Sequence, residues 1–219
     1  MSNKCVGIDL GLKEFLATSD GQKVESQDFY RELEPAIAAA QRAKKKQRLR
    51  ALHAKVKARR RDALQKLSTA LVKEYGAIFI GNVNASALSQ TRLAKSVRDA
   101  GWSAFRTMLQ YKCDDAGVWF AEVDEAFSTQ TCSCCASRTG PKGVAGLGIR
   151  SWRCEACGTL HDRDVNAAKN ILMKGMLSRA AGAELLDGQT SSSFAAGRGR
   201  LAEGIVGPLG SEDVKSRSL

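Results

Sequence analysis

Residues 150–172, RSWRCEACGTLHDRDVNAAKNIL, join a Cys-x-x-Cys pair to a segment with the composition of a helix. The carboxylate of Asp162 is suited to cap the free amides of the first helical turn. One aspartate is enough for a cap, so Asp164, which lies further into the first turn, needs another explanation. The stretch therefore predicts a metal-binding knuckle that ends where a carboxylate-bearing helix begins.

The knuckle has a counterpart upstream. Cys132 and Cys135 form one Cys-x-x-Cys pair, Cys154 and Cys157 form the other, and eighteen residues separate the two pairs. This spacing is typical of a zinc ribbon, in which four thiolates surround one tetrahedral Zn²⁺ ion. Because four thiolates close the coordination shell, we expect a structural ion and no activated water.

Other metal ligands remain open at this point. Cys134 is an alternative to its neighbours within CSCC, and His161 is an alternative ligand if Cys157 is not used. Cys5 and Cys113 lie in apolar surroundings, so we expect them to be core residues.

Short apolar runs predict the strands of a mixed α/β sheet. Residues 5–24 suggest two strands and the start of a third after Ser19-Asp20-Gly21, and residues 77–81 and 118–123 read as buried parallel strands. Residues 31–75 and about 94–116 have helical periodicity. Asp9 lies within the first apolar strand, where an unpaired carboxylate is costly and needs a partner or a cation.

The positive charge is concentrated in one segment. Residues 41–66 hold twelve Lys and Arg and one acid, so their net charge of +11 equals that of the whole chain. Such a concentration is typical of a surface that binds a polyanion, and the alternative is a solvated helix face. The candidate nucleic-acid contacts are Lys44, Lys45, Lys46, Arg48, Arg59, Arg60 and Arg61.

Composition also excludes some classes of protein. The chain has 219 residues and no run of 18 apolar residues, so a membrane span is not expected. Its first residues have no charged region leading into an apolar one, so a secretory signal is not expected either. We therefore expect a cytoplasmic protein, in which cysteines bind metal more often than they form disulfides.

GIDLG (7–11), the two cysteine pairs and HDRDVNAAKNI (161–171) together resemble the TnpB (OrfB) proteins of insertion sequences. They also resemble the RuvC-type nuclease domain of type V CRISPR effectors. The resemblance covers about residues 4–173. It implies an RNase H-like (RuvC-type) fold with a basic helical arm and an inserted four-cysteine zinc ribbon. It further implies Mg²⁺-dependent DNA cleavage directed by a guide RNA, with Asp9 and Asp164 as catalytic acids.

The second catalytic acid of that family is missing. Where the resemblance implies a Glu at the end of a strand, this chain has Gly81 followed by Asn82. The first interpretation is an inactive nuclease that still binds nucleic acid. The second is a relocated acid on the neighbouring strand end, for which EVDEAFST (122–129) offers Glu122, Asp124 and Glu125. We favour Glu125, because it lies just beyond the strand. Whether the chain is an enzyme depends on this choice.

The resemblance also predicts the domain organisation. The expected parts are a nuclease core over residues 1–128 with its arm at 31–75, a zinc ribbon at 129–160, a final catalytic helix at 161–176 and a disordered tail at 177–219. Family members carry an N-terminal region before the first catalytic strand. We therefore expect a separate N-terminal half or a dimer partner, with DNA and guide RNA as further partners.

Overall fold

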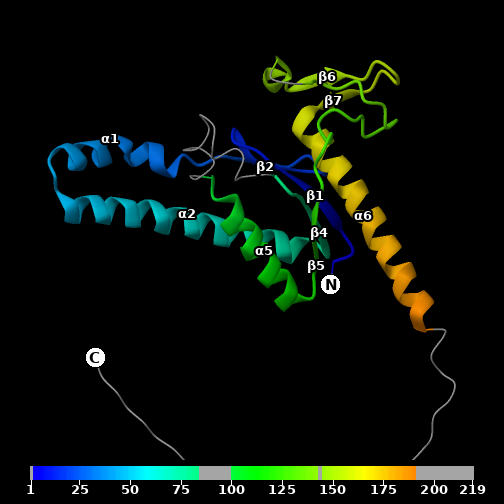
Figure 1. Ribbon diagram of the computed structural model, residues 1–219, viewed down its shortest axis with the longest axis horizontal. Helices are drawn as coiled ribbons and strands as arrows, with labels where there is room; N and C mark the ends of the chain where they lie inside the picture. Colours follow the sequence, from blue (N-terminus) through cyan, green and yellow to red (C-terminus); the bar gives the residue numbers. More distant parts are fainter. Residues whose placement is uncertain (1, 84–99, 143–144, 191–219) are drawn as a thin grey trace, which may run out of the picture. The chain divides into compact units, whose positions relative to one another are not determined.

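Five strands form a mixed sheet in the order β3-β2-β1-β4-β5 (Figure 1). They are β1 (Cys5–Leu10), β2 (Glu14–Thr18), β3 (Lys23–Glu25), β4 (Ala77–Gly81) and β5 (Trp119–Val123). Strands β1, β2 and β3 are antiparallel neighbours, whereas β1, β4 and β5 run parallel. The computed structural model describes residues 2–83, 100–142 and 145–190. The predicted mixed α/β sheet is confirmed.

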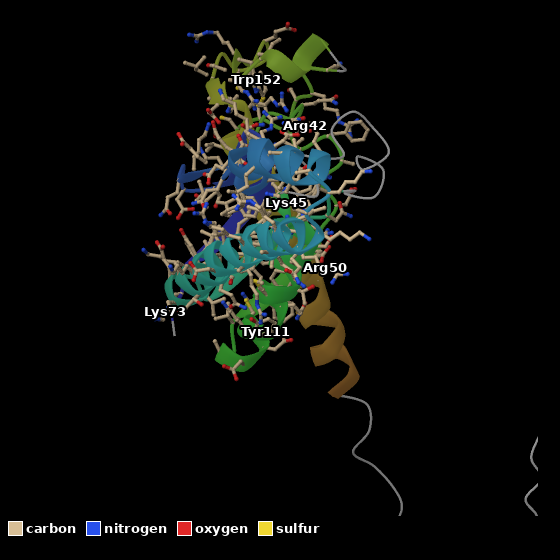
Figure 2. The ribbon with its side chains drawn as sticks, turned by 90° about the vertical axis from the view of Figure 1, so that its left-hand side faces the viewer. Arg42, Lys45, Arg50, Lys73, Tyr111 and Trp152 are labelled. Carbon is tan, nitrogen blue, oxygen red and sulfur yellow. The ribbon has the colours of Figure 1, made fainter. Side chains whose placement is uncertain are left out.

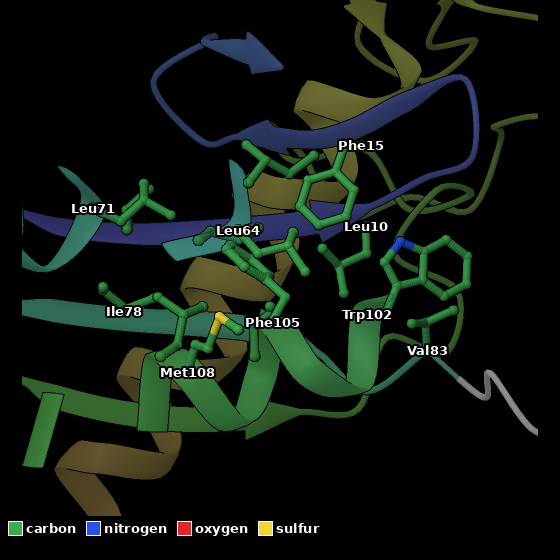
Figure 3. Packing of buried hydrophobic residues seen from close by; sticks show 14 of the residues in the cluster. Leu10, Phe15, Leu64, Leu71, Ile78, Val83, Trp102, Phe105 and Met108 are labelled. Atoms are coloured by element: carbon green, nitrogen blue, oxygen red, sulfur yellow. The ribbon is translucent and has the colours of Figure 1, made fainter. Parts of the chain in front are cut away.

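Side chains along the strands point alternately to the two faces of the sheet, so two separate hydrophobic clusters form. On β1, Val6 and Ile8 are buried in the larger cluster, with residues of α2 (Lys46–Glu74) and α5 (Trp102–Ala116). Figure 3 shows this packing, in which Phe105 of α5 lies edge-on to Phe15 at 5.1 Å between ring centroids. Because successive side chains of a strand point to opposite faces, Asp9 belongs to the other face of the sheet.

Helix α6 (Arg163–Thr190) packs on that other face, where Ile171 and Phe79 are buried together. Two glycines allow a close approach. A Cβ on Gly7 would lie 2.1 Å from the carbonyl oxygen of Ala168, and a Cβ on Gly175 would lie 2.2 Å from the Phe79 ring. The helix backbone therefore lies almost directly on β1, which brings the start of α6 to the end of that strand.

An arm of two helices, α1 (Phe29–Arg42) and α2, contains the basic segment in its turn and in α2, and the two helices lie side by side (Figure 1). Arg59 of α2 pairs with Glu32 of α1 at 3.0 Å. Helix α1 ends in a left-handed residue, Lys44 at φ 51°, and the amide of Lys45 donates to the carbonyl of Ala40 at 3.0 Å. The predicted helical stretch 31–75 is therefore interrupted at residues 43–45.

Helix α5 confirms the part of the predicted helix that spans residues 102–116. It follows Gly101 and ends at Gly117, and both glycines are left-handed, with φ of 72° and 65°. Gly117 is the predicted end of this helix. The earlier part of the predicted helix, residues 94–99, lies outside the described residues.

The prediction that residues 177–190 are disordered is wrong, because helix α6 continues to Thr190. Met176, Leu177, Arg179, Ala180 and Ala181 are strong helix formers, and they extend a helix that is already nucleated against the sheet. Residues 191–219 lie outside the described residues.

A second, two-stranded sheet precedes α6. Strands β6 (Ser151–Arg153) and β7 (Leu160–Asp162) pair antiparallel. The chain divides into two units, Met1–Gly182 and Ala183–Leu219, and every site described below lies in the first. Within the described ranges, the helices are too short or too polar to cross a membrane.

Candidate active site

Asp9, Glu125 and Asp164 line one cavity of about 490 Å³. Glu14 of β2 lines the same cavity and pairs with Lys23 at 3.0 Å. Asp9 comes from β1, Asp164 from the first turn of α6, and Glu125 from the segment after β5. Strands β1 and β5 are both parallel to β4, so their carboxyl ends lie at the same edge of the sheet. Ligand sites of such sheets gather at that edge. The structure thus brings together the three acids that the sequence suggested.

Glu125 fills the space beside Gly81. A Cβ on Gly81 would lie 2.7 Å from Oε2 of Glu125 and 3.3 Å from its Cβ. Real Cβ atoms essentially never come within 3.0 Å of another heavy atom, so a side chain at residue 81 would displace the carboxylate at the flexible end of Glu125 from its present position. The carboxylate of residue 125 therefore occupies the place where a side chain of residue 81 would begin.

Asn82 fixes the backbone that carries Glu125. The Asn82 amide donates to the carbonyl oxygen of Val123 at 2.9 Å. Its side-chain Oδ1 accepts a hydrogen bond from the amide of Glu125 at 3.2 Å. The Gly81-Asn82 pair thus supplies both the room for Glu125 and an anchor for it.

The two neighbouring acids are engaged elsewhere. Glu122 is exposed, and its Oε2 accepts a hydrogen bond from Arg106 at 3.0 Å. Asp124 is also exposed, and its Oδ1 accepts from the amide of Ala126 at 3.0 Å. Neither residue lines the cavity that holds Asp9.

Burial and neighbouring charges raise the pKa of Asp9 and of Glu125. Burial raises the pKa of Asp9 well above its ordinary value, and the charges of Asp164 and Glu125 raise it further, while Arg163 opposes them. Burial, and then the charge of Asp124, raise the pKa of Glu125. Several carboxylates that line one cavity are oxygen ligands of the type that a hard divalent cation such as Mg²⁺ prefers.

Two arginines balance part of this negative charge. Nη1 of Arg150 lies 3.1 Å from Oδ2 of Asp164, and Nε of Arg163 lies 3.7 Å from its Oδ1. Both arginines line the cavity. Their guanidinium groups are therefore within reach of any anion that enters beside the three acids.

Asp162 caps α6, as its place in the sequence suggested. Its Oδ1 accepts hydrogen bonds from the amides of Asp164 at 3.2 Å and Val165 at 3.0 Å. Its Oδ2 accepts one from Lys23 of β3 at 2.7 Å. Partial burial works against ionisation, but the Lys23 ammonium and the two amides lower the pKa of Asp162. Asp162 is thus occupied by the cap, whereas Asp164 faces the cavity.

Four cysteines form a cluster that fits one metal ion. The Sγ atoms of Cys132, Cys135, Cys154 and Cys157 all lie within 4.8 Å of one another. The Thr139 hydroxyl donates to Cys154 at 3.3 Å and lowers the pKa of that thiol to about 6. Thiolates at this separation suit the tetrahedral shell of zinc.

The alternative ligands lie outside this cluster. Cys134 is exposed, and only its backbone amide is directed at the cluster, 3.4 Å from Sγ of Cys132. His161 is buried against Trp152, with Nε2 at 3.0 Å from Sγ of Cys132. Because Cys157 belongs to the cluster, His161 is a neighbour of the thiols rather than a substitute for one of them.

The basic side chains gather on the arm. Lys44, Lys45, Lys46 and Arg48 are exposed around the turn between α1 and α2. Figure 2 looks onto this end of the arm and shows Arg42, Lys45 and Arg50 there. Further along α2, Arg59 and Arg61 are exposed, while Arg60 is half-buried. The turn therefore offers a cationic surface apart from the acidic cavity.

Sequence reasoning missed several polar residues around the acids. Arg150 and Asn82 gave no periodic signal, because they lie in short segments at the ends of strands. Asn166 and Asn170 are buried, with 1% and 3% of their surfaces exposed, and both donate to backbone carbonyls. Their spacing of four residues, on the face of a helix that otherwise buries Ala and Ile, was the available signal.

Two family models match this chain. One is described as Cas12f1-like, TNB domain, and matches residues 102–171. The other is OrfB_IS605, described as a probable transposase, and matches residues 1–92. Together they cover the sheet, the arm and the cysteine cluster.

Individual relatives agree with these matches. A putative RNA-guided DNA endonuclease of Streptomyces pristinaespiralis is 35% identical over 191 residues, covering 81% of this chain and 46% of the relative. The putative RNA-guided DNA endonuclease InsQ of Escherichia coli K12 is 27% identical over 216 residues, covering 86% and 53%. The chain therefore spans about half the length of the curated relatives it matches.

Solved structures show the same fold. A complex of Cas12f1 with sgRNA and target DNA aligns with a TM-score of 0.60 at 17% identity, covering 77% of this chain and 49% of that one. A CRISPR-Cas12f ternary complex aligns with a TM-score of 0.57 at 18% identity, covering 78% and 40%. The mixed sheet, the family models and the sequence relatives agree, and the chain belongs to the TnpB (OrfB) family.

Proposed function

We propose that this chain carries the catalytic centre of an RNA-guided DNA endonuclease and hydrolyses phosphodiester bonds with Mg²⁺. The central observation is that Asp9, Glu125 and Asp164 line one cavity at the carboxyl edge of the sheet. The mixed sheet with α6 packed on the Asp9 face supports an RNase H-like (RuvC-type) core.

Each acid has a distinct support. Asp9 is held by β1, Asp164 by the capped first turn of α6, and Glu125 by the side chain of Asn82. These carboxylates are the residues that would hold Mg²⁺. When bound, Mg²⁺ supplies positive charge against the phosphate oxygens of an in-line displacement.

The arginines give the cavity a second role. Arg150 and Arg163 pair with Asp164 while the acids are uncompensated. The planar, multidentate guanidinium groups suit a phosphate, so Arg150 and Arg163 would be able to bind a nucleic-acid backbone beside a cation held by Asp164. The cavity would then hold a cation and a nucleic-acid backbone side by side.

The cysteine cluster is proposed to hold a structural Zn²⁺ ion. All four candidate ligands are thiols, which leaves no open coordination position for chemistry. The cluster precedes β7 and the Asp162 cap directly. A folded ribbon therefore fixes where α6 starts and, with it, where Asp164 lies.

DNA and guide RNA are the proposed partners. The exposed cations around Lys44–Arg48 suit a phosphate backbone, which they would bind without regard to sequence. The names of the relatives support RNA guidance, which is a property of proteins about twice as long as this chain. A separate N-terminal half or a dimer partner stays a prediction.

The alternative is an inactive nucleic-acid-binding protein. It is favoured by the Gly at residue 81, where the resemblance implies a catalytic Glu. In that case Glu125 is an ordinary loop residue, and the zinc ribbon and arm carry the function.

Moving the acid from residue 125 to residue 81 distinguishes an active nuclease from an inactive nucleic-acid-binding protein. Glu125→Ala should weaken Mn²⁺ binding, followed by electron paramagnetic resonance, and should reduce Mg²⁺-dependent nicking of single-stranded DNA. The loss should exceed the roughly 10–100-fold that removal of an outer-shell partner costs. Gly81→Glu combined with Glu125→Ala should restore both, because the carboxylate 2.7 Å from a Cβ at residue 81 is then absent, and the nearest remaining atoms are Cδ1 of Ile171 at 3.1 Å and the Cβ of residue 125 at 3.3 Å.

Glu122→Ala is the matched control, since it removes a nearby acid on β5 that pairs with Arg106 and does not line the cavity. Unchanged Mn²⁺ binding in Glu125→Ala would reject the relocated acid. A parent chain that neither binds Mn²⁺ nor nicks DNA would establish the inactive alternative.

A further inference from the structure

Helix α6 presents three polar side chains at four-residue intervals on one face. They are Asn166, Asn170 and Lys174, and the two asparagines are almost completely buried. Residues four apart lie above one another on a helix, so the three groups form a row along the helix axis. The proposed chemistry does not use any of them.

All three donate hydrogen bonds to the segment that carries Glu125. Lys174 Nζ lies 2.9 Å from the carbonyl oxygens of both Asp124 and Ala126. Asn170 Nδ2 lies 2.8 Å from the carbonyl oxygen of Ser128 and 2.7 Å from that of Thr131. Asn166 Nδ2 reaches the same two carbonyls, at 3.3 Å and 2.7 Å. The row therefore binds four carbonyls between residues 124 and 131.

That segment has little to hold it in place by itself. It contains no strand or helix, and apart from the amide of Glu125, which donates to Asn82, the hydrogen bonds of its amides lie within local turns, such as Ser128 to the carbonyl of Glu125 at 3.0 Å. Phe127 adopts a left-handed φ of 62°, which is unfavourable for a residue with a Cβ, and its side chain is exposed. The donors on α6 and the Asn82 side chain supply the outside contacts that fix its path.

The same helix carries Asp164. Asp164 precedes Asn166 by two residues, which on an α-helix is a rotation of about 200°, so its side chain leaves a different face. One face of α6 thus presents an acid to the cavity while another holds the backbone of Glu125. Because both are parts of one rigid element, the separation of the two acids is set by the helix.

We infer that Asn166, Asn170 and Lys174 are positioning residues, which hold the 124–131 segment so that Glu125 meets Asp9 and Asp164 with the spacing a divalent cation needs. This inference rests on the proposed function, because it gives the row a role in metal binding. It explains why two amides and an ammonium lie where a helix packed on a sheet would otherwise carry apolar side chains.

The test uses Lys174→Met, which removes two hydrogen bonds at a half-buried position, and Asn170→Asp, which keeps the shape of the side chain but removes its donors. Lys169→Met is the control, since Lys169 is exposed on the same helix. Two quantities are measured on the zinc-loaded chain at a temperature where every variant is folded. They are Mn²⁺ affinity by electron paramagnetic resonance and amide hydrogen exchange in residues 124–131.

Both test variants should bind Mn²⁺ about 10-fold more weakly, as expected when an outer-shell hydrogen bond is removed. They should exchange faster in residues 124–131 while β1 and β4 stay protected, and Lys169→Met should match the parent. Parent-like Mn²⁺ affinity in both variants would overturn the positioning role and leave the proposed function standing. If the parent binds no Mn²⁺, the proposed metal site fails, and faster exchange alone would reduce the row to a structural clamp.

Discussion

The ionised carboxylate of Asp9 is a candidate metal ligand, but it is unfavourable for the stability of the folded chain. Its carboxylate lies at a cavity wall with Asp164 and Glu125 for neighbours, and burial together with their charges raises its pKa. Its folded-state pKa exceeds that of the unfolded chain, so the folded state binds the proton more tightly. Asp9 therefore contributes stability at acid pH, and that contribution is lost as the pH rises through the folded pKa.

Asp9→Asn should consequently stabilise the chain at neutral pH in buffer without Mg²⁺ or Mn²⁺. The melting temperature should rise by several degrees, at about 2–4 °C per kcal/mol for a chain of this size. The gain should disappear near the ordinary pKa of an aspartate, about 3.9, where the native carboxylate is protonated in both states.

Thermal melts of both chains across the pH range, with and without Mg²⁺, check this prediction. Added Mg²⁺ should stabilise the parent but not Asp9→Asn, because only the parent retains the ligand. A variant that is less stable than the parent at neutral pH would mean that Asp9 is a structural partner and not a repelled ligand.

The ribbon element joins metal binding to the start of α6. Cys154 lies just after β6, and β7 ends at Asp162, the cap of the helix. His161, between them, lies against both Trp152 and Cys132. Loss of the ion should therefore loosen the first turn of α6 as well as the knuckles.

Cys154→Ser should abolish the binding of one Zn²⁺ per chain and lower the melting temperature, because the remaining thiols no longer close a tetrahedral shell. Cys134→Ser should retain the zinc, since its side chain is exposed and outside the cluster. Metal content by mass spectrometry and thermal melting measure both effects. Zinc retained by Cys154→Ser, or lost from Cys134→Ser, would require a different ligand set.

Several elements could be predicted because their signals are local. Residues 77–81 are a short apolar run between glycines, and they form β4 at those bounds. Gly117 ends α5 because a left-handed C-cap favours glycine. The turn at Lys44 had no such signal, since the sequence there is three lysines. The left-handed residue is stabilised by hydrogen bonds from the amides of Lys44 and Lys45 to carbonyls in the last turn of α1.

The residues of the candidate site likewise divide into those with a local sequence signal and those without one. Asp9 and Asp164 are visible in the sequence because each is an acid that a strand or a helix cap does not explain. The space that Glu125 fills depends on the missing side chain of Gly81, which lies on another strand and is a tertiary property. The row on α6 depends on carbonyls about forty residues away in the chain, such as that of Ser128 for Asn170.

At the scale of the whole molecule, the charge distribution separates two functions. The net charge of +11 equals that of residues 41–66, whereas four acids, Asp9, Glu14, Glu125 and Asp164, line the cavity. The Debye length is about 8 Å at physiological ionic strength, so the arm attracts a polyanion with little effect on the acidic site. Backbone binding and metal binding should therefore respond to different substitutions.

Replacing Lys44, Lys45 and Lys46 together by Gln should weaken DNA binding and flatten its dependence on salt. For duplex DNA the slope of log K against log[salt] should fall by up to about 2.7, because each phosphate that is no longer neutralised accounts for about 0.9. Fluorescence anisotropy at several salt concentrations measures this slope, and Mn²⁺ binding should be unchanged.

A control with the same net charge replaces Lys73, Lys142 and Lys169, which are exposed away from the turn of the arm. This triple substitution should leave the slope near that of the parent. Equal losses in the two triple variants would show that overall charge, and not the arm, controls the affinity.

The 2.7 Å between a Cβ at residue 81 and the carboxylate of Glu125 also constrains how such a chain can evolve. In an ancestor with glutamates at both positions, the side chain of residue 81 would displace that of residue 125 from its present place. Mutation of residue 81 from Glu to Gly, which takes a single base change, would leave that place to Glu125. A second acid near the site would thus allow the chain to keep its function after the loss of the first.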